Sequence, residues 1–334
     1  MSSEAANMKI GLIGGSGFIG QRLVQYLTME GHVVKIIDIA EPPVSRPDIA
    51  YRNCDVRDLP ALTEAIHGQD MVINLAAAHR DDVRPVSLYH DVNVQGAQNV
   101  CDAAEACGID RILFTSSVAI YGLQEGVPDE ETPAKPFNPY GETKWNAEKV
   151  YETWFRKAPQ RRSLFIVRPT VVFGPANRGN VYGLIKQLAS GLFIMIGDGE
   201  NRKSMAYVEN VASFLAHLAQ ERTPGEAIYN YVDKPDFSMN ELLRVVRTAL
   251  GKTGEPKLRL PYFVGMAIAS LFDAAAAVTG HNFPISRVRV QKFCANTIFD
   301  ASRLKHTGFV PPASLSEGLS LTIAQEFPGR SKNP

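Results

Sequence analysis

The sequence has only four cysteines, and they form none of the patterns that bind metals or build disulfide frameworks. No two of them stand as a Cys-x-x-Cys pair, and none lies at metal-ligand spacing from a histidine; the four are Cys54, Cys101, Cys107 and Cys294. We therefore expect free thiols in a reducing compartment and no metal site.

An excess of one charge is also missing. Lys and Arg number 35, Asp and Glu number 35, and the formal net charge is zero. Because proteins that bind nucleic acid carry a basic excess, we expect no nucleic acid among the partners. The first residues are polar and lack the apolar core of a signal peptide, so we expect a cytoplasmic protein.

Long apolar runs are scarce as well. The one that stands out covers residues 261–280, and Asp273 interrupts it. A membrane span needs about 20 apolar residues without a central charge, so we do not expect one here. The run has basic flanks, which are Lys257, Arg259, Arg287, Arg289 and Lys292. Two interpretations stay open: a core helix of a small lobe, or a helix resting peripherally on the anionic inner face of the cell membrane.

The first half of the chain alternates apolar runs with helical patterns. The expected strands are 9–13, 33–37, 71–75, 112–115 and 164–168, and the expected helices are 21–30, 59–67 and 87–107. Continuous apolar strands that alternate with helices are typical of a parallel sheet buried on both faces. The pattern predicts an α/β fold with a Rossmann doubly wound parallel sheet.

The pattern changes after about residue 175. Helices are expected at 181–190, 209–220 and 239–250, with short strands at 193–196, 227–232 and 297–299. A chain of 334 residues is long enough for a large sheet domain and a second lobe. We place the sheet domain at 1–175, with part of 205–232 returning to it, and a smaller C-terminal substrate lobe at 176–330.

A glycine-rich turn joins the first strand to the first helix, and its residues are Gly14, Gly15, Ser16, Gly17, Phe18, Ile19 and Gly20. Glycine permits the tight turn and the close approach of a pyrophosphate, which the free N–H groups at the helix start then bind. Asp38 ends the second strand at the distance where an acid bonds the adenosine ribose. Because no arginine follows it directly, we expect NAD; Arg46 keeps NADP as the alternative.

Two further strand ends belong to the expected cofactor site. Asp55 and Val56 follow the short third strand segment, and Leu75, Ala76 and Ala77 follow the fourth strand. Small residues at this edge let a dinucleotide lie across the switch point of the sheet.

A serine, a tyrosine and a lysine predict the reaction class. Ser116 and Ser117 end the fifth strand, and Tyr140 and Lys144 follow at the start of a helix. Residues four apart share one helical face. A free phenol has a pKa near 10, and a neighbouring ammonium and a nicotinium ring would lower it enough for acid–base work. We expect Ser117 to bond the same substrate oxygen.

These motifs resemble the extended short-chain dehydrogenase/reductases that act on sugars, the NAD-dependent epimerases and dehydratases. The carriers are GGSGFIG at 14–20, TSSVAIYG at 115–122, NPYGETK at 138–144 and RPTVVFGP at 168–175, with GDGENRKSMAYVENV at 197–211 and TIFDASRL at 297–304. The resemblance implies that Ser117, Tyr140 and Lys144 are catalytic. It also implies that Asn93 braces the helix near the active site, and that Tyr140, Lys144, Pro169 and Thr170 contact NAD.

The resemblance also narrows the reaction. Dehydratases of this family carry acids just after the catalytic serine, where this chain has Val118 and Ala119, so a 4-epimerase is implied. Longer stretches at 76–100, 177–193, 229–242 and 286–301 resemble members that act on GlcNAc or GalNAc linked to undecaprenyl diphosphate, in O-antigen and lipopolysaccharide synthesis. A UDP-GlcNAc or UDP-glucose 4-epimerase, a net dehydrogenase and a non-catalytic NAD binder are the alternatives.

A sugar diphosphate needs cationic and polar donors. The candidates for the substrate site are His79, Ser116, Ser117, Arg178, Asn180, Arg202 and Lys203, although solvated surface charge is an equally good interpretation of the basic ones. Many relatives have arginine where Lys203 stands. The resemblance further implies a homodimer formed through two helices that flank the sheet.

Overall fold

The computed structural model describes residues 7–44, 46–80, 83–123, 125–191, 193–252, 258–279 and 286–328. Within the expected apolar run and its flanks, Gly280 and Lys257 lie outside the described residues. The chain divides into two compact units. Unit 1 comprises Met1–Val172, Val208–Val232 and Phe299–Ala313, and unit 2 comprises Phe173–Tyr207, Asp233–Ile298 and Ser314–Pro334. Segment 299–313, expected in the C-terminal lobe, therefore belongs to unit 1.

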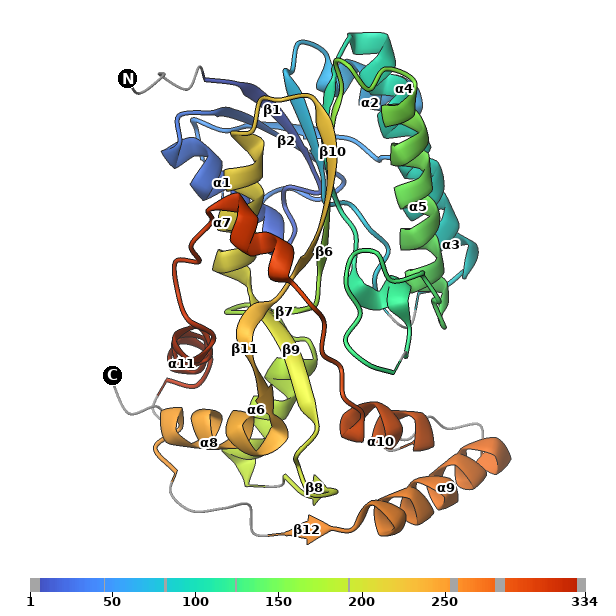
Figure 1. Ribbon diagram of the computed structural model, residues 1–334, viewed down its shortest axis with the longest axis vertical. Coiled ribbons are helices and arrows are strands. Elements are labelled where there is room, and N and C mark those ends of the chain that lie inside the picture. Colours follow the sequence, from blue (N-terminus) through green and yellow to red (C-terminus); the bar gives the residue numbers. More distant parts are fainter. Residues whose placement is uncertain are drawn as a thin grey trace. The chain divides into compact units, whose positions relative to one another are not determined.

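Unit 1 is built on a seven-stranded sheet with the order β10-β6-β5-β4-β1-β2-β3 (Figure 1). Every neighbouring pair in it is parallel. The strands are β1 (Lys9–Ile13), β2 (Val33–Asp38), β3 (Ala50–Asn53), β4 (Met71–Asn74), β5 (Arg111–Thr115), β6 (Ser163–Pro169) and β10 (Gly225–Tyr231). This order confirms the doubly wound parallel sheet that the sequence predicts.

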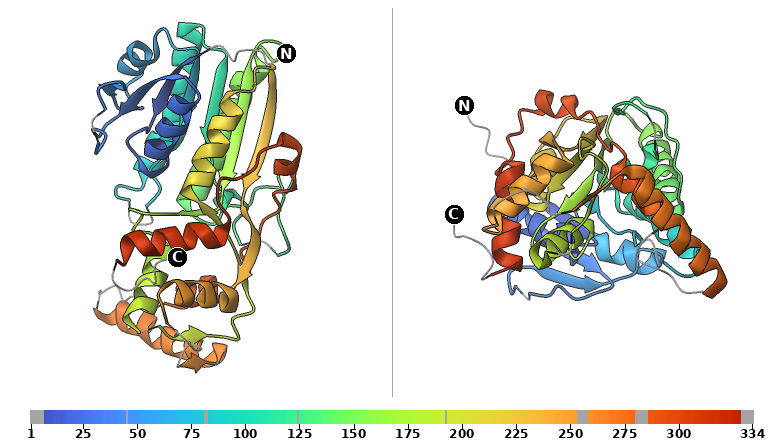
Figure 2. Two further views of the ribbon diagram at one scale, coloured as in Figure 1. Left: turned by 90° about the vertical axis from the view of Figure 1, so that its left-hand side faces the viewer. Right: turned by 90° about the horizontal axis from the view of Figure 1, so that it is seen from below.

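Helices cover both faces of this sheet. One face carries α1 (Phe18–Met29) and α7 (Val208–Ala219), which pack against each other (Figures 1 and 2). The other carries α2 (Leu59–Ile66), α4 (Gly96–Cys107) and α5 (Pro139–Arg156). All residues of β4 and β6 are buried, because apolar side chains on both faces meet helices. The core thus holds the carboxyl ends of β1, β4 and β5 rigidly in line.

The expected helix at 87–107 is interrupted by a π-helical turn. Its parts are α3 (Ser87–His90), η1 (Asp91–Gln95) and α4. A π turn widens a helix locally and is frequent at functional sites. Here it carries Asn93, which is buried.

Unit 2 contains two small sheets and several helices. Its strands are β8 (Met195–Ile196), β9 (Arg202–Tyr207), β11 (Asp233–Ser238) and β12 (Arg259–Leu260). The three-stranded sheet has the order β11-β9-β7, in which β7 is Val171–Phe173, and β12 pairs with β8. Its helices are α6 (Asn180–Ser190), α8 (Met239–Ala249), α9 (Tyr262–Thr279), α10 (Arg287–Cys294) and α11 (Leu315–Glu326). α9 packs along α10.

One expected strand is wrong. Residues 297–299 form no strand; Thr297 makes a single isolated bridge to Lys203. The backbone N–H of Thr297 donates to the Arg202 carbonyl and that of Ser204 donates to the Thr297 carbonyl, and the pairing ends there. Phe299 belongs instead to unit 1, where its ring lies against Tyr121 with 5.9 Å between centroids.

α9 occupies most of the apolar run that the sequence singles out. Nevertheless, within the residues that the structure describes, no helix combines the length and the hydropathy that crossing a membrane requires. Of the α9 residues whose burial is described, only Gly265 and Ala269 are buried. A core helix would bury more of its surface, so the core interpretation of this run is not what unit 2 displays.

Candidate active site

The glycine-rich turn between β1 and α1 forms a cradle that only glycine can build. Gly14 has a φ of +77°, and a Cβ there would lie 2.7 Å from the backbone N of Ala76. A Cβ on Gly20 would lie 2.6 Å from Gly15. The turn therefore packs directly against the end of β4 and against its own helix, and its glycines permit the close approach of a ligand to the backbone.

The start of α1 is suited to an anion. Gly17 is the N-cap residue and makes no side-chain capping bond, and the first turn, which begins with Phe18 and Ile19, contains no acid. The N–H groups at a helix start carry partial positive charge and bind phosphate when no side chain satisfies them. The turn and the helix start thus fit the pyrophosphate of a dinucleotide.

Asp38 lies beside this cradle at the end of β2. Its Oδ2 accepts a hydrogen bond from the Ser16 N–H at 3.0 Å, and its Oδ1 accepts one from the Ala40 N–H at 3.1 Å. These bonds fix the carboxylate where the adenosine ribose would lie, and each oxygen retains a lone pair for a ribose hydroxyl. Arg46 is paired with Asp48 at 2.5 Å, so its guanidinium is already engaged by a carboxylate.

The other expected cofactor residues follow β3 and β4. The Asp55 carboxylate accepts bonds from Arg57, which lower the pKa of Asp55. Val56 is buried against Gly96. After β4, the Leu75 N–H donates to the Ile13 carbonyl at 2.9 Å, and the Ala76 N–H donates to Asn74 Oδ1 at 3.0 Å. The backbone of both segments is thereby held at the carboxyl edge of the sheet.

Asn93 ties the cofactor side of the site to α5. Its Oδ1 accepts from the Ala78 N–H at 2.8 Å, and its Nδ2 donates to the Ala78 carbonyl at 3.1 Å and to Thr143 Oγ1 at 2.9 Å. Thr143 directly precedes Lys144. This is the bracing geometry that the resemblance implies for Asn93.

Ser117 begins a 3₁₀ turn, η2 (Val118–Tyr121), and its Oγ accepts a bond from the Ala119 N–H at 3.1 Å. Because that bond uses an acceptor lone pair, the Ser117 proton stays available to a second partner. The phenol of Tyr140 lies close enough to this hydroxyl for Ser117 to lower the pKa of Tyr140. The structure therefore brings together the serine and the tyrosine that the sequence predicts.

α5 presents Tyr140 in its first turn. Asn138 caps the helix by accepting a bond from the Gly141 N–H at 2.8 Å, and Pro139 occupies the position where no N–H is needed. Burial raises the pKa of the Tyr140 phenol, and the bond from Ser117 opposes that rise. For Tyr140 to act as a base, the lowering of its pKa expected from Lys144 and a nicotinium ring must exceed the rise caused by burial.

Lys144 lies one helical turn further on, and its side chain is buried. Its Nζ lies 4.1 Å from the centroid of the Phe114 ring. Burial lowers the pKa of Lys144 to about 7, and the Glu148 carboxylate, one more turn along α5, acts in the opposite direction. At neutral pH this amine can gain or lose a proton without a large free-energy cost.

Two neighbouring hydroxyls lack a hydrogen-bond partner among the described residues. Thr115 Oγ1 and Ser116 Oγ are buried at the end of β5, and neither has a hydrogen-bond partner in the part of the chain that the structure describes. A buried hydroxyl without a partner is costly, so each indicates a bound group or water. Both hydroxyls thus fit a bound ligand at this end of the sheet, and the glycine cradle and Asp38 fit a dinucleotide.

The remaining cofactor and sheet-edge candidates make local contacts. Pro169 ends β6, and the N–H of the buried Thr170 donates to the Tyr231 carbonyl at 3.1 Å. The His79 ring lies on the exposed loop after β4, with Nδ1 3.3 Å from the Ala77 carbonyl.

In unit 2, the basic candidate substrate residues already have protein partners. Arg178 pairs with Glu326 and stacks on Tyr182 at 4.3 Å, and Asn180 is exposed at the start of α6. Arg202 donates to the Asp236 carbonyl at 2.9 Å.

Lys203 is the most constrained of the candidate cations. Its Nζ donates to the carbonyls of Lys292 and Ala295, at 2.9 Å and 2.6 Å, so its ammonium binds the end of α10. Burial lowers its pKa to about 8.

Sequence reasoning missed a buried ion pair next to the site. Glu148 on α5 and Arg168 on β6 bind each other through two hydrogen bonds, of 3.0 Å and 2.7 Å. The spacing of four residues between Lys144 and Glu148 places both on one face of α5 and could have indicated Glu148. Nothing local pointed to Arg168, because only the pairing of β6 with β5 brings it to α5.

Comparison with known proteins agrees with this geometry. The family model "NAD dependent epimerase/dehydratase family" matches residues 10–231. An Escherichia coli O157:H7 protein, N-acetyl-alpha-D-glucosaminyl-diphospho-ditrans,octacis-undecaprenol 4-epimerase, is 49% identical over 321 residues, 96% of each chain. Isoform 2 of a 3beta-hydroxysteroid-dehydrogenase/decarboxylase from Arabidopsis thaliana is 30% identical over 350 residues, which cover 93% of this chain and 60% of that protein.

A solved structure shares the fold. The UDP-glucuronic acid 4-epimerase from Bacillus cereus, in complex with NAD, superposes with a TM-score of 0.73 at 21% identity and covers 95% of this chain and 98% of its own. The resemblance drawn from the motifs and the expectation of NAD as cofactor are confirmed. The chain belongs to the NAD-dependent epimerase/dehydratase family of extended short-chain dehydrogenase/reductases.

Proposed function

We propose that this protein is the 4-epimerase of an N-acetylhexosamine carried on undecaprenyl diphosphate, interconverting GlcNAc and GalNAc for O-antigen synthesis. The identity of 49% over 96% of both chains with the Escherichia coli O157:H7 enzyme of that name carries the proposal. The Ser117, Tyr140 and Lys144 arrangement on unit 1 supports it, because a non-catalytic NAD binder has no use for a phenol that a serine acts on and that lies one helical turn from a buried amine.

The site residues act on the 4-hydroxyl of the sugar. Tyr140 accepts the hydroxyl proton as the carbonyl forms and returns it when the alcohol is restored. Ser117 holds the same oxygen, and Lys144 supplies positive charge that favours the phenolate. Bound NAD supplies the hydride chemistry at C4, without net redox change. Inversion requires the 4-keto sugar to present its other face, so the substrate pocket must allow that rotation.

Elimination chemistry is disfavoured by the turn after Ser117. A dehydratase needs a second acid or base to remove a proton at C5. Val118 and Ala119 occupy those positions, and Val118 is buried in a cluster with Ile120, Tyr121 and Phe299. The turn therefore serves packing, and the reaction stops at epimerisation.

We assign recognition of the diphosphate to Arg178, Asn180, Arg202 and Lys203 of unit 2, and contacts to the sugar to His79, Ser116 and Ser117. Arg178 and Arg202 have more than half of their side chains exposed, at 62% and 51%, so each can turn from its carboxylate toward a phosphate. The buried, partnerless Ser116 hydroxyl supports its assignment to a bound ligand.

A polyprenyl substrate places the enzyme at the cytoplasmic face of the membrane. α9 offers exposed apolar side chains there, with Phe263 73% exposed and Leu271 72% exposed. Arg287 and Arg289 of α10, which packs along α9, are exposed as well. An apolar helix with basic neighbours suits peripheral contact with anionic lipid. We further propose a homodimer, which sedimentation velocity would test as a particle of twice the chain mass.

The substrate assignment is tested by side-by-side assays. The NAD-loaded protein is incubated with undecaprenyl-diphospho-GlcNAc or with UDP-GlcNAc, and the released sugars are identified by chromatography. We expect GalNAc from the lipid-linked substrate at a kcat/KM at least about tenfold higher than from UDP-GlcNAc, a difference of about 1.4 kcal/mol in the transition state. A preference for UDP-GlcNAc would replace the lipid-linked assignment, and steady NADH accumulation would indicate a net dehydrogenase.

A further inference from the structure

A buried polar network lies behind the catalytic residues of unit 1. We call Tyr121, Glu130, Glu148, Arg168 and Asn230 the Arg168 network. Arg168 is 3% exposed and Glu148 is fully buried. The Arg168 Nε and Nη2 atoms donate to Oε1 and Oε2 of Glu148. One edge of the guanidinium is therefore fully used by this carboxylate.

The first arm of the network reaches the helix that carries two catalytic residues. Glu148 lies on α5 one turn after Lys144 and two turns after Tyr140. Because a bidentate guanidinium–carboxylate pair fixes both distance and orientation, Arg168 holds this face of α5 against β6. A rotation of α5 that moved Lys144 would have to break both bonds.

The second arm reaches the turn that begins at Ser117. The Arg168 Nη1 donates to the Tyr121 hydroxyl at 2.7 Å and to the Glu130 carbonyl at 3.1 Å. Tyr121 is the last residue of η2, the 3₁₀ turn that Ser117 caps. The Tyr121 hydroxyl in turn donates to Asn230 Oδ1 at 2.8 Å. One guanidinium therefore contacts both elements that carry the catalytic side chains.

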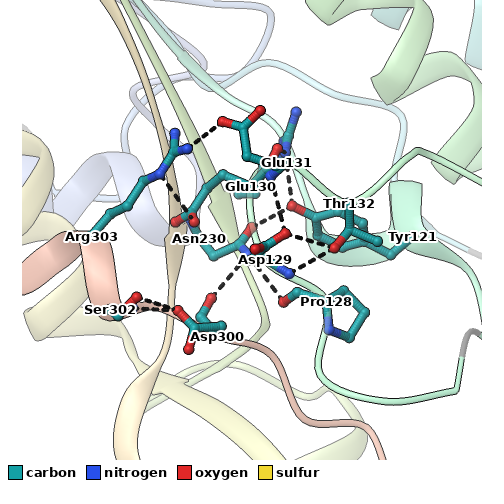
Figure 3. Close-up of polar contacts among 11 residues, drawn as sticks. Tyr121, Pro128, Asp129, Glu130, Glu131, Thr132, Asn230, Asp300, Ser302 and Arg303 are labelled. Atoms are coloured by element: carbon teal, nitrogen blue, oxygen red, sulfur yellow. Dashed lines mark hydrogen bonds and ion pairs between the residues drawn. The ribbon is translucent and has the colours of Figure 1, made fainter.

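The far side of the network is anchored as well. Figure 3 shows Tyr121, Glu130, Asn230 and Arg303 meeting from separate segments of unit 1. The Asn230 N–H donates to Glu130 Oε1 at 2.7 Å, and Arg303 Nε lies 3.5 Å from Glu130 Oε2. The side-chain Nδ2 of Asn230 also donates to the Asp300 backbone carbonyl at 3.0 Å. The η2 turn is thus tied to β10 and to segment 299–313.

Stability alone is a weak reason for such a network. Burying an arginine and a carboxylate removes both from water, and well-packed apolar residues of similar volume usually stabilise a fold as much or more. Buried ion pairs are better at fixing one arrangement of their elements. Reacting groups misplaced by about 1 Å can lose on the order of 10²-fold in rate, so an arrangement fixed between Ser117 and Tyr140 has catalytic value.

We propose that Arg168 is a positioning residue of the epimerase, which holds the Ser117 turn and the Tyr140–Lys144 helix in register by binding Tyr121 and Glu148 at once. The inference rests on the proposed function, because it concerns turnover at that site. It extends beyond that function, since Arg168 and Tyr121 act through Ser117, Tyr140 and Lys144 without reaching the substrate themselves.

Arg162, six residues before Arg168, provides a matched control. It directly precedes β6, is 4% exposed, lies over the Trp154 ring at 4.4 Å and pairs with Glu105 at 3.3 Å. Arg168 resembles it in burial and lies 5.4 Å from the Tyr121 ring. Arg168→Lys and Arg162→Lys each replace a buried guanidinium by an ammonium. Of the two arginines, Arg168 is the one that contacts the turn after Ser117.

The first test compares turnover of undecaprenyl-diphospho-GlcNAc by the NAD-loaded variants. We expect Arg168→Lys to lower kcat about 10²-fold with KM changed by less than about threefold, because the lost effect is orientation in the transition state. Arg162→Lys should keep kcat within about threefold at a comparable loss of melting temperature. A normal kcat in folded Arg168→Lys, or an equal loss in Arg162→Lys, overturns the proposal.

Tyr121→Phe covers the case in which Arg168→Lys does not fold. It removes one hydroxyl and keeps the ring that packs on Phe299. We expect a kcat loss of about tenfold or more at unchanged NAD content, and a wild-type kcat would overturn the proposal.

A second readout needs no substrate. In NAD-loaded protein labelled with [ζ-¹³C]tyrosine, the Tyr140 signal is assigned by its absence in Tyr140→Phe and followed as a function of pH. Loss of the Ser117 bond should move the Tyr140 titration to higher pH in Arg168→Lys and Tyr121→Phe, and not in Arg162→Lys. An unmoved titration contradicts positioning. If the wild-type protein turns over no lipid-linked sugar, the proposed function fails while this titration still decides the role of Arg168.

Discussion

The Nζ of Lys144 lies 4.1 Å from the centroid of the Phe114 ring, inside the core that joins β5 to α5. The ring face is electron-rich and favours the ammonium form, while burial disfavours it. Burial, opposed by the Glu148 carboxylate, lowers the pKa of Lys144 to about 7. Lys144, the lysine proposed for catalysis, is therefore held near neutrality by its surroundings in unit 1.

A pH profile tests this balance. The ammonium of Lys144 supports the Tyr140 phenolate, so kcat/KM should decline as Lys144 loses its proton above a pH near 7. Phe114→Leu removes the ring and lowers the pKa of Lys144 further, so the decline should begin at lower pH. Phe214→Leu, at a buried ring on α7, is the control. An identical alkaline limb in Phe114→Leu and wild type would refute the role of the ring.

Tyr140→Phe should separate chemistry from cofactor binding. Without the phenol hydroxyl no group accepts the 4-hydroxyl proton, and the loss in kcat should be about 10²–10⁴-fold. The glycine cradle and Asp38 are untouched, so the NAD released on denaturation should match the wild-type amount. The assignment of Tyr140 would be lost if the variant kept wild-type turnover.

Gly14→Ala should abolish NAD binding for a steric reason. Its Cβ would lie 2.7 Å from the Ala76 backbone, whereas a Cβ at Gly68, which has a similar φ of +74°, meets nothing within 4 Å. Both substitutions carry the left-handed penalty of about 1–2 kcal/mol. Only Gly14→Ala should lose NAD in equilibrium dialysis, and equal NAD content in the two variants would contradict the cradle.

The stability of unit 1 should fall in mild acid because of His32. The side chain is 2% exposed, and its Nδ1 accepts a bond from the Met8 N–H at 3.3 Å. Burial, followed by Arg222 and Arg111, lowers the pKa of His32 below its ordinary value of 6.5. The unfolded chain then binds the proton more readily, so stability present above pH 6.5 is lost as the pH falls below it.

Thermal unfolding of His32→Asn at pH 7 and pH 5 checks the sign. Asparagine keeps an acceptor near the Met8 N–H and cannot be protonated, so the difference in melting temperature between the two pH values should shrink. His90→Asn, at an exposed side chain, should retain the wild-type difference. A larger difference in His32→Asn would contradict the expected direction.

Membrane contact through α9 predicts a charge-sensitive flotation. The wild-type protein should co-float with liposomes that contain anionic lipid, less so at high salt. Phe263→Glu should reduce flotation strongly, since it buries a charge at the lipid boundary. Val310→Glu, at a residue of unit 1 that is 80% exposed, should not. Wild-type protein that never co-floats would remove the membrane from the proposed function.

Much of the fold and the site could be predicted because the signals are local. The glycine turn, Asp38 at the end of β2, and Tyr140 with Lys144 on one helical face all follow from spacing within an element. Segment 297–299 looked like a strand because it is short and apolar. A single bridge to Lys203 replaced the strand, since hydrogen-bond partners rather than composition decide short strands.

Taken alone, the amino-acid sequence determined the doubly wound sheet and the glycine-rich turn, and it supplied Ser117, Tyr140 and Lys144 as the proposed catalytic side chains, because each depends on periodicity or on neighbours within a few residues. Only the tertiary structure decided that Arg168 joins Tyr121 to Glu148, and that burial beside the Phe114 ring, opposed by Glu148, sets the pKa of Lys144. Those residues come from different strands and helices, and the parallel order of β10, β6 and β5 brings them together.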